Sequence, residues 1–111
     1  MNDKQIIQLY LDRSENAITE TSDKYSPYCK KISMNILQNE SDAQEAVNDT
    51  WFKAWNTIPP QHPNPLKTYL GMLVRTISIN RYKYYTAQKR NSQFDVLLSE
   101  VEEMIPPLKP I

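Results

Sequence analysis

The sequence predicts an all-α fold, a compact bundle of three to four helices with a proline-rich loop before the last long helix. Three observations lead to this prediction. Apolar residues recur at helical spacing through most of the chain. A single glycine in 111 residues argues against a sheet-rich fold with many tight turns. Four of the eight prolines fall within residues 59–65, which are therefore expected to form a loop. The length suits one domain.

The first helical pattern runs from about residue 3 to residue 37. Its apolar positions are Ile6, Ile7, Tyr10, Leu11, Ala17, Ile18, Tyr25, Tyr28, Ile32, Ile36 and Leu37. Pro27 is unfavourable inside a helix, because its ring clashes with the preceding turn and it has no N–H group to donate. The sequence leaves two alternatives open: a new helix begins at Ser26–Pro27, or a longer helix bends there.

A second helix is predicted from Ser41 to about Thr57. Ser41 and Gln44 have the spacing of a capping box. One side of this helix should face the core, and it carries Ala43, Val47, Thr50, Trp51, Ala54 and Ile58. Phe52 falls nearly opposite, within a polar ring made of Glu45, Asn48, Asp49 and Asn56. Phe52 either packs under a neighbouring helix or is an exposed anchor for a partner protein, and acidic neighbours would favour a basic partner.

The last long helix is predicted from Leu66 to about Lys89, with Asn64–Pro65 as its N-cap and first turn. The expected buried stripe consists of Leu66, Leu70, Leu73, Ile77 and Tyr84. The expected outward side consists of Gly71, Arg75, Tyr82, Lys83, Lys89 and Arg90. A short helix is predicted over residues 94–104, ahead of a proline-containing segment that is typical of a linker.

Charge is unevenly distributed along the chain. The formal net charge is zero, yet residues 51–94 contain seven Lys or Arg and no Asp or Glu. Basic residues interleaved with tyrosines suit phosphate contact and base stacking, and Gln61, His62 and Asn64 could add hydrogen bonds to bases. The alternatives are an ordinary solvated basic face, or neutralisation by the acidic residues of the first half of the chain.

No catalytic pattern can be assembled from this sequence, so we expect no enzymatic activity and no cofactor. His62 has no cysteine partner and no zinc-binding spacing. Asp42, Glu45 and Asp49 share one side of a helix and could hold a cation, but such residues are usually only solvated, and we expect no metal. The lone Cys29, the absence of a signal-peptide pattern and the absence of a long apolar run predict a cytoplasmic protein without membrane insertion.

Two segments resemble a known family. DAQEAVNDTWFKAW, residues 42–55, resembles the DAEDLVQETFLKAW-type segment of bacterial RNA polymerase sigma factors, especially the extracytoplasmic function (ECF) branch of the sigma-70 family. TYLGMLVRTISINRYK, residues 68–83, is similar to the family's WLYRIARNLALDRLR-type segment, at the expected distance. The resemblance covers roughly residues 3–93 and implies a sigma region 2 domain over residues 1–93.

The resemblance implies a transcription initiation factor domain. Such a domain binds core RNA polymerase through the β′ clamp helices, and its last helix and preceding loop recognise and melt the −10 promoter element, holding the non-template strand. By position, the core-polymerase contacts would be Glu45, Asn48, Asp49 and Phe52. The promoter DNA contacts would be Gln61, His62, Asn64, Tyr69, Arg75, Asn80, Arg81, Tyr82, Lys83 and Lys89. An anti-sigma factor would be a further partner.

Residues 94–111 are expected to be the start of an interdomain linker. A complete ECF sigma factor continues into a second helical domain that binds the −35 element, so we expect the chain to be a fragment without that domain. The alternative function is a helical protein-interaction module, a sigma-like regulator that does not bind DNA. Charges of residues 51–94 that pair with the N-terminal acids would favour the interaction module. An open basic face beside the proline loop would favour promoter binding.

Overall fold

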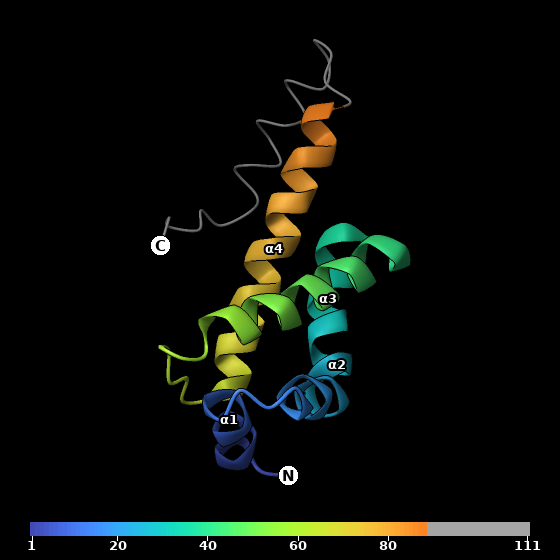
Figure 1. Cartoon of the computed structure of the whole chain (residues 1–111). Coiled ribbons are helices and arrows are strands. Elements are labelled where there is room, and N and C mark those ends of the chain that lie inside the picture. The colour runs from blue at the N-terminus through green and yellow to red at the C-terminus, as the bar shows by residue number, and fades with distance from the viewer. Residues whose placement is uncertain (89–111) are drawn as a thin grey trace.

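The computed structural model describes residues 1–88, which form four helices and no strand. The helices are α1 (Asp3–Leu11), α2 (Asn16–Leu37), α3 (Glu40–Thr57) and α4 (Leu66–Gln88). The first three surround one half of α4, and the other half of α4 extends beyond them (Figure 1). The predicted all-α bundle is confirmed, while the helix predicted over residues 94–104 lies outside the described residues. None of the four helices is long and apolar enough to cross a membrane.

The first helical pattern is broken at residues 12–15, earlier than expected. α1 ends in a Schellman motif, in which the Ser14 N–H donates to the Leu9 carbonyl (2.9 Å) and the Arg13 N–H donates to the Tyr10 carbonyl (3.0 Å). Arg13 adopts the left-handed conformation, with a φ of 55°. Glycine usually occupies this position of the motif. Because no glycine is present, nothing in the local sequence marks the end of α1.

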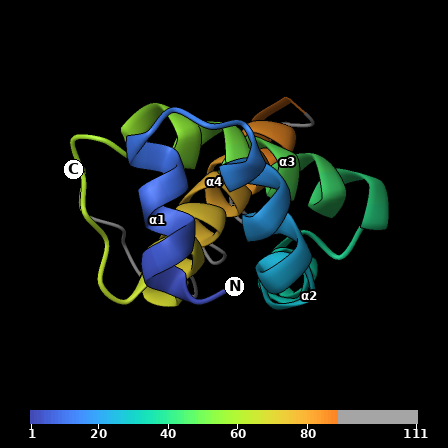
Figure 2. The same cartoon turned by 60° about the horizontal axis from the view of Figure 1, so that its bottom comes forward.

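Pro27 lies inside α2. The alternative in which a new helix begins at Ser26–Pro27 is therefore wrong. The two halves of α2 run in clearly different directions (Figures 1 and 2), which agrees with the alternative of one longer helix that bends. Proline is the usual cause of such a bend, because it removes one hydrogen bond from the ladder.

The start of α3 also differs from the prediction. The Asn39 side chain accepts a hydrogen bond from the Asp42 N–H (2.9 Å), so Asn39 is the N-cap and the helix begins at Glu40. The predicted capping box at Ser41 is wrong, because Ser41 already lies within the first turn. The end of α3 at Thr57 agrees with the prediction.

The core-facing stripe predicted for α3 is confirmed, since every one of its positions is buried. In α4 the predicted buried stripe is confirmed at Leu66, Leu70 and Leu73, whereas Ile77 is only half-buried. Two other positions of α4 were assigned to the wrong side. Tyr84 is 60% exposed, because α4 there extends past the helices that could cover it (Figure 1). Gly71 is buried instead of facing outward, because Tyr28 of α2 packs against its backbone.

Polar groups inside the bundle are all paired within the described part of the chain. Tyr10 donates to the Thr21 hydroxyl (2.7 Å), which in turn donates to the Ala17 carbonyl (2.7 Å). The Ser33 and Ser78 hydroxyls form a 2.8 Å hydrogen bond that joins α2 to α4. Burial without a compensating bond would destabilise each of these groups, so the pairs help to fix how the helices pack.

Candidate functional site

The outward face of α3 presents an exposed aromatic ring among polar side chains. Phe52 is 68% exposed, and Glu45, Asn48 and Asp49 beside it on the same helix are exposed as well. The alternative in which Phe52 packs under a neighbouring helix is therefore wrong. An exposed Phe in a ring of polar groups has the composition of a protein-binding anchor.

Arg81, a residue of α4, links that helix to the acidic residues on the outward face of α3. Its guanidinium forms ion pairs with Glu45 (Nη1–Oε2 2.9 Å) and Asp49 (Nη2–Oδ2 2.7 Å). The hydrogen bond to Asp49 raises the pKa of Arg81 above its usual value. Both carboxylates are more than half exposed, so solvent screening limits each pair to about 0.2–1 kcal/mol.

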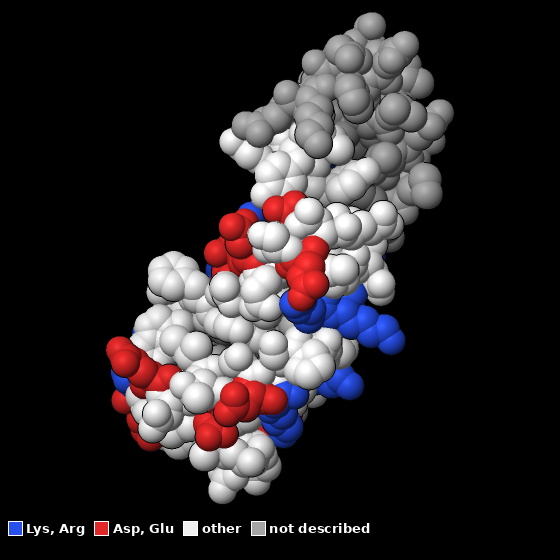
Figure 3. Space-filling view, turned by 90° about the vertical axis from the view of Figure 1, so that its right-hand side faces the viewer, with Lys and Arg blue, Asp and Glu red and all other residues white. Residues whose placement is uncertain are grey.

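Tyr85, one turn after Arg81, extends this network. Its hydroxyl receives a hydrogen bond from Arg81 Nη1 (3.3 Å) and donates to Asp42 Oδ1 (3.3 Å). The three acids that could have held a cation therefore bind Arg81 and Tyr85. Among residues 1–88 no group of three potential ligands is arranged to hold a metal ion. Ion pairs also occur elsewhere, between Lys24 and Asp3 and between Lys30 and Glu40. On the face shown in Figure 3, Asp and Glu side chains lie beside Lys and Arg side chains in several places.

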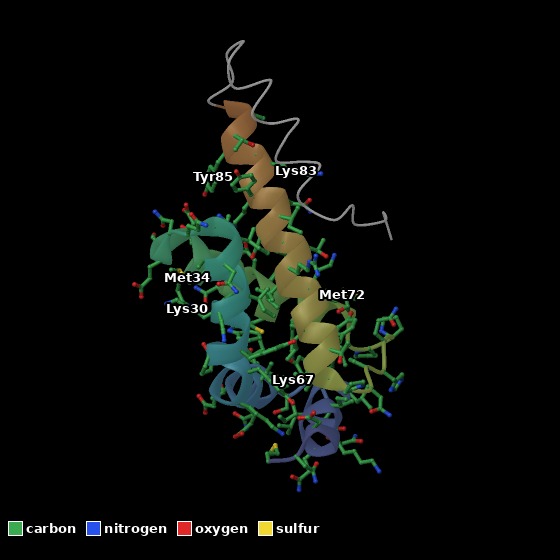
Figure 4. All side chains as sticks on the ribbon, turned by 180° about the vertical axis from the view of Figure 1, so that it is seen from behind. Lys30, Met34, Lys67, Met72, Lys83 and Tyr85 are labelled. Atoms are coloured by element: carbon green, nitrogen blue, oxygen red, sulfur yellow. The ribbon has the colours of Figure 1, made fainter. Side chains whose placement is uncertain are left out.

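The predicted DNA-contact residues of α4 divide between two sides of the helix. Arg75 and Lys83 are exposed on the outer side, and Figure 4 shows Lys83 and Met72 on this side with Tyr85 opposite. Tyr82 is half-buried and follows Arg75 by two helical turns, which places both on similar faces. Asn80 and Arg81, in contrast, line a shallow hollow together with Asp49. Lys89 lies outside the described residues.

The loop before α4 has fixed ends and exposed polar side chains. Gln61, His62 and Asn64 are exposed, whereas Pro63 between them is buried and anchors the loop to the bundle. The Gln61 N–H donates to the Thr57 carbonyl (2.8 Å) at the end of α3. This combination leaves three hydrogen-bonding side chains available to a ligand on a loop whose backbone is held in place.

Tyr69 lies at the base of this loop. It is half-buried against the hydrophobic core, and its hydroxyl donates to the Thr57 hydroxyl oxygen (2.8 Å). The hydroxyl is therefore engaged inside the protein, and only the exposed part of the ring is available for contact with a base.

Arg13, which the sequence analysis missed, also contacts this region. Its Nη1 donates to the carbonyls of Trp55 (2.9 Å) and Ile58 (3.0 Å), and its guanidinium lies 3.7 Å from the centre of the Trp55 ring. The turn between α1 and α2 passes the end of α3 at the start of the loop (Figure 2). These partners are 42 and 45 residues away in the sequence, so no local pattern could have revealed the contact.

Comparison with protein families identifies the domain. A family described as sigma-70 region 2 matches residues 22–89, more than half of the chain. The chain belongs to this family, whose domains are non-enzymatic transcription factor domains that bind RNA polymerase and recognise the −10 promoter element. No curated protein and no solved structure gives a significant match. The matched residues include α3, the proline-rich loop and α4, whereas α1 and Arg13 precede them.

Proposed function

We propose that the chain contains region 2 of an ECF-type sigma factor. In this proposal the domain docks on the β′ clamp helices of core RNA polymerase through the outward face of α3. It holds the non-template strand of the −10 element with the proline-rich loop and the outer side of α4. The observation that carries the proposal is the exposed Phe52 with Glu45, Asn48 and Asp49 around it. A partner would bury the ring at the centre of its interface and meet the carboxylates with basic side chains. The domain would span residues 1–93, with residues 94–111 beginning a linker to a further domain.

The DNA part of the proposal rests on the loop and on the outer side of α4. Arg75 and Lys83 are exposed, and the ion pairs that the structure gives to residues 51–88 all involve Arg81. Exposed cations on one side of a helix suit contacts to successive phosphates. The exposed side chains of Gln61 and His62 would bond the edge of an unstacked base. Asn80 and Arg81 border the hollow beside Asp49 of α3; Asn80 is exposed, whereas Arg81 is half-buried and forms two ion pairs.

A second candidate function is a helical interaction module that does not bind DNA. It is favoured by the ion pairs of Arg81 with Glu45 and Asp49, since these join one basic residue of the 51–94 segment to the acids of the first half of the chain. Arg75 and Lys83, the exposed cations of the proposed DNA-contact set within the described residues, decide between the two functions. Substituting both would weaken promoter binding in the first case and would leave every interaction of the chain unchanged in the second.

The polymerase contact can be tested with a fragment that contains the β′ clamp helices. Phe52→Ala removes the anchor, and Asp49→Lys reverses one charge of its ring. Loss of an anchor that contributes about 2 kcal/mol should weaken binding about 30-fold. Met72→Ala is the matched control, because Met72 is also an exposed apolar residue (41%) but lies on α4. Circular dichroism should show unchanged helix content in all three variants.

Two outcomes would refute the assignment. Phe52→Ala that lowers the melting temperature sharply while binding is preserved would make Phe52 a packing residue. Phe52→Ala and Met72→Ala that weaken clamp-helix binding equally would mean that the α3 face has no special role.

A further inference from the structure

We propose that Arg13 is a positioning residue, which fixes the start of the proline-rich loop and thereby sets which base the loop prefers. This inference rests on the proposed function, because it assigns a means of specificity to the same loop. It concerns the α1–α2 turn, which precedes the residues matched by the family.

Arg13 has an unusual backbone conformation. With a φ of 55°, Arg13 occupies the left-handed position at which helices usually place glycine. A long side chain in that conformation is unfavourable for the backbone. Gln38, at the end of α2, has a similar φ of 53°, so the role of Arg13 rests on what its side chain contacts.

The Arg13 guanidinium contacts both the end of α3 and an aromatic ring. One nitrogen donates to two carbonyls at the end of α3, those of Trp55 and Ile58, which would otherwise be left without a helical partner. A cation is favourable at this end of a helix, where the carbonyls carry partial negative charge. The same guanidinium lies 3.7 Å from the centre of the Trp55 ring, a distance typical of a cation–π contact.

These contacts lie at the junction between α3 and the proline-rich loop. Ile58 is the residue directly before the loop, and Thr57 beside it accepts the Gln61 N–H and the Tyr69 hydroxyl. Arg13 therefore holds the junction from which Gln61 and His62 are presented to solvent. A loop that is already ordered binds its ligand without an additional entropic cost, and discriminates better between similar ligands.

Three variants separate positioning from general stability. Arg13→Gly removes the guanidinium and supplies the residue best suited to the backbone at this position, so the fold and the melting temperature should be retained. Arg13→Lys keeps the positive charge and a nitrogen that can donate to carbonyls, but it lacks the planar guanidinium that lies against the Trp55 ring while it donates. Lys4→Ala, which removes an exposed basic residue of α1, is the matched control for charge.

The experiment uses the full chain bound to its cognate core RNA polymerase. The probe is a forked DNA with randomised bases in the single-stranded non-template segment, and the bound fraction is sequenced. We expect Arg13→Gly to reduce base discrimination about tenfold at one or two adjacent positions and to leave the other positions unchanged. Arg13→Lys should be intermediate, Lys4→Ala should match the wild type, and affinity for core polymerase should change less than about twofold in all.

Hydrogen exchange of the Gln61 amide in the free protein gives a readout that needs no DNA. If Arg13 holds the junction, this amide should exchange about tenfold faster in Arg13→Gly. Unchanged exchange, an unchanged selection profile, or an equal loss of preference at every position would each overturn the inference. A wild type without any base preference would instead refute the proposed −10 function, and the Gln61 amide would still decide whether Arg13 positions the loop.

Discussion

Replacing the single glycine of the chain tests how closely α2 and α4 pack. Gly71 lies in the second turn of α4, and a Cβ atom placed there would lie 2.6 Å from the hydroxyl oxygen of Tyr28 and 3.3 Å from its Cζ. A contact of 2.6 Å cannot persist, so Gly71→Ala forces the Tyr28 ring to move. The ring is half-buried between the helices, with the Lys67 ammonium 4.8 Å from its centre.

Two effects of opposite sign determine the result. Alanine in place of glycine stabilises a helix interior by about 1 kcal/mol, whereas overpacking costs about 1–3 kcal/mol. We therefore expect Gly71→Ala to lower the free energy of unfolding by about 1 kcal/mol. Tyr28→Phe removes the clashing oxygen and leaves Cζ, at 3.3 Å, as the nearest atom. In that background Gly71→Ala should be neutral or stabilising, which corresponds to a coupling of about 1–2 kcal/mol between the two positions.

The assay is urea unfolding of the four proteins of this double-mutant cycle, monitored by the helix signal in circular dichroism at 222 nm. The dependence of the unfolding free energy on urea concentration is compared across the variants. Two results would refute the reasoning. A Gly71→Ala protein more stable than the wild type would mean that α2 and α4 do not approach so closely. The same effect of Gly71→Ala in the Tyr28 and Phe backgrounds would mean that the hydroxyl is not the obstacle.

Two further predictions concern charge. Binding to single-stranded −10 DNA can be measured by fluorescence anisotropy across a salt series, and for the wild type the log of the affinity should fall with the log of the salt concentration with a slope of about −2 to −3. Lys83→Ala should reduce the magnitude of this slope by about 0.7, whereas Tyr69→Ala should weaken binding without changing the slope. Equal, salt-independent affinities of the wild type and the charge variant would indicate that the basic side is only solvated. Burial alone would raise the pKa of Asp3, but hydrogen bonds from Lys24 and Tyr25 outweigh it and lower the pKa below the usual Asp value. The folded protein therefore binds this proton more weakly than the unfolded chain, so the stabilisation is complete above the usual Asp pKa and is lost as the pH falls through the lowered one. Urea unfolding at several pH values should show a smaller loss of stability on acidification for Asp3→Asn, and an identical pH dependence of variant and wild type would contradict this.

The sequence predicts those features that depend on local periodicity. The stripe of α3 and the outward direction of Phe52 follow from the helical repeat, because a residue's direction is set by its position on the helix. The repeat leaves open whether a neighbouring helix covers Phe52, and the structure shows that the residue is exposed. The proline-rich loop follows from backbone chemistry, since closely spaced prolines cannot remain in a helix. The family resemblance of residues 42–55 is confirmed at the level of sigma-70 region 2.

Features that depend on how the helices meet were not predictable from the pattern. Gly71 and Tyr84 were assigned to the wrong sides of α4, because their burial depends on where α2 and α3 cover that helix. The charge blocks of the sequence indicate which segments are acidic or basic, but not which side chains pair, and so the ion pairs of Arg81 were missed. The contacts of Arg13 were missed for a similar reason, since its partners lie far along the chain.

Recovery of promoter fragments by core RNA polymerase tests the central claim most directly. Core polymerase would be incubated with sheared genomic DNA, with and without the chain, and the retained fragments sequenced. The account predicts that the wild-type chain binds the polymerase and enriches fragments that share a −10 element, and that Phe52→Ala abolishes this enrichment. It also predicts that replacing both Arg75 and Lys83 with Ala preserves polymerase binding and removes the enrichment. A chain that binds the polymerase but enriches no shared element would contradict promoter recognition and leave the interaction module as its function.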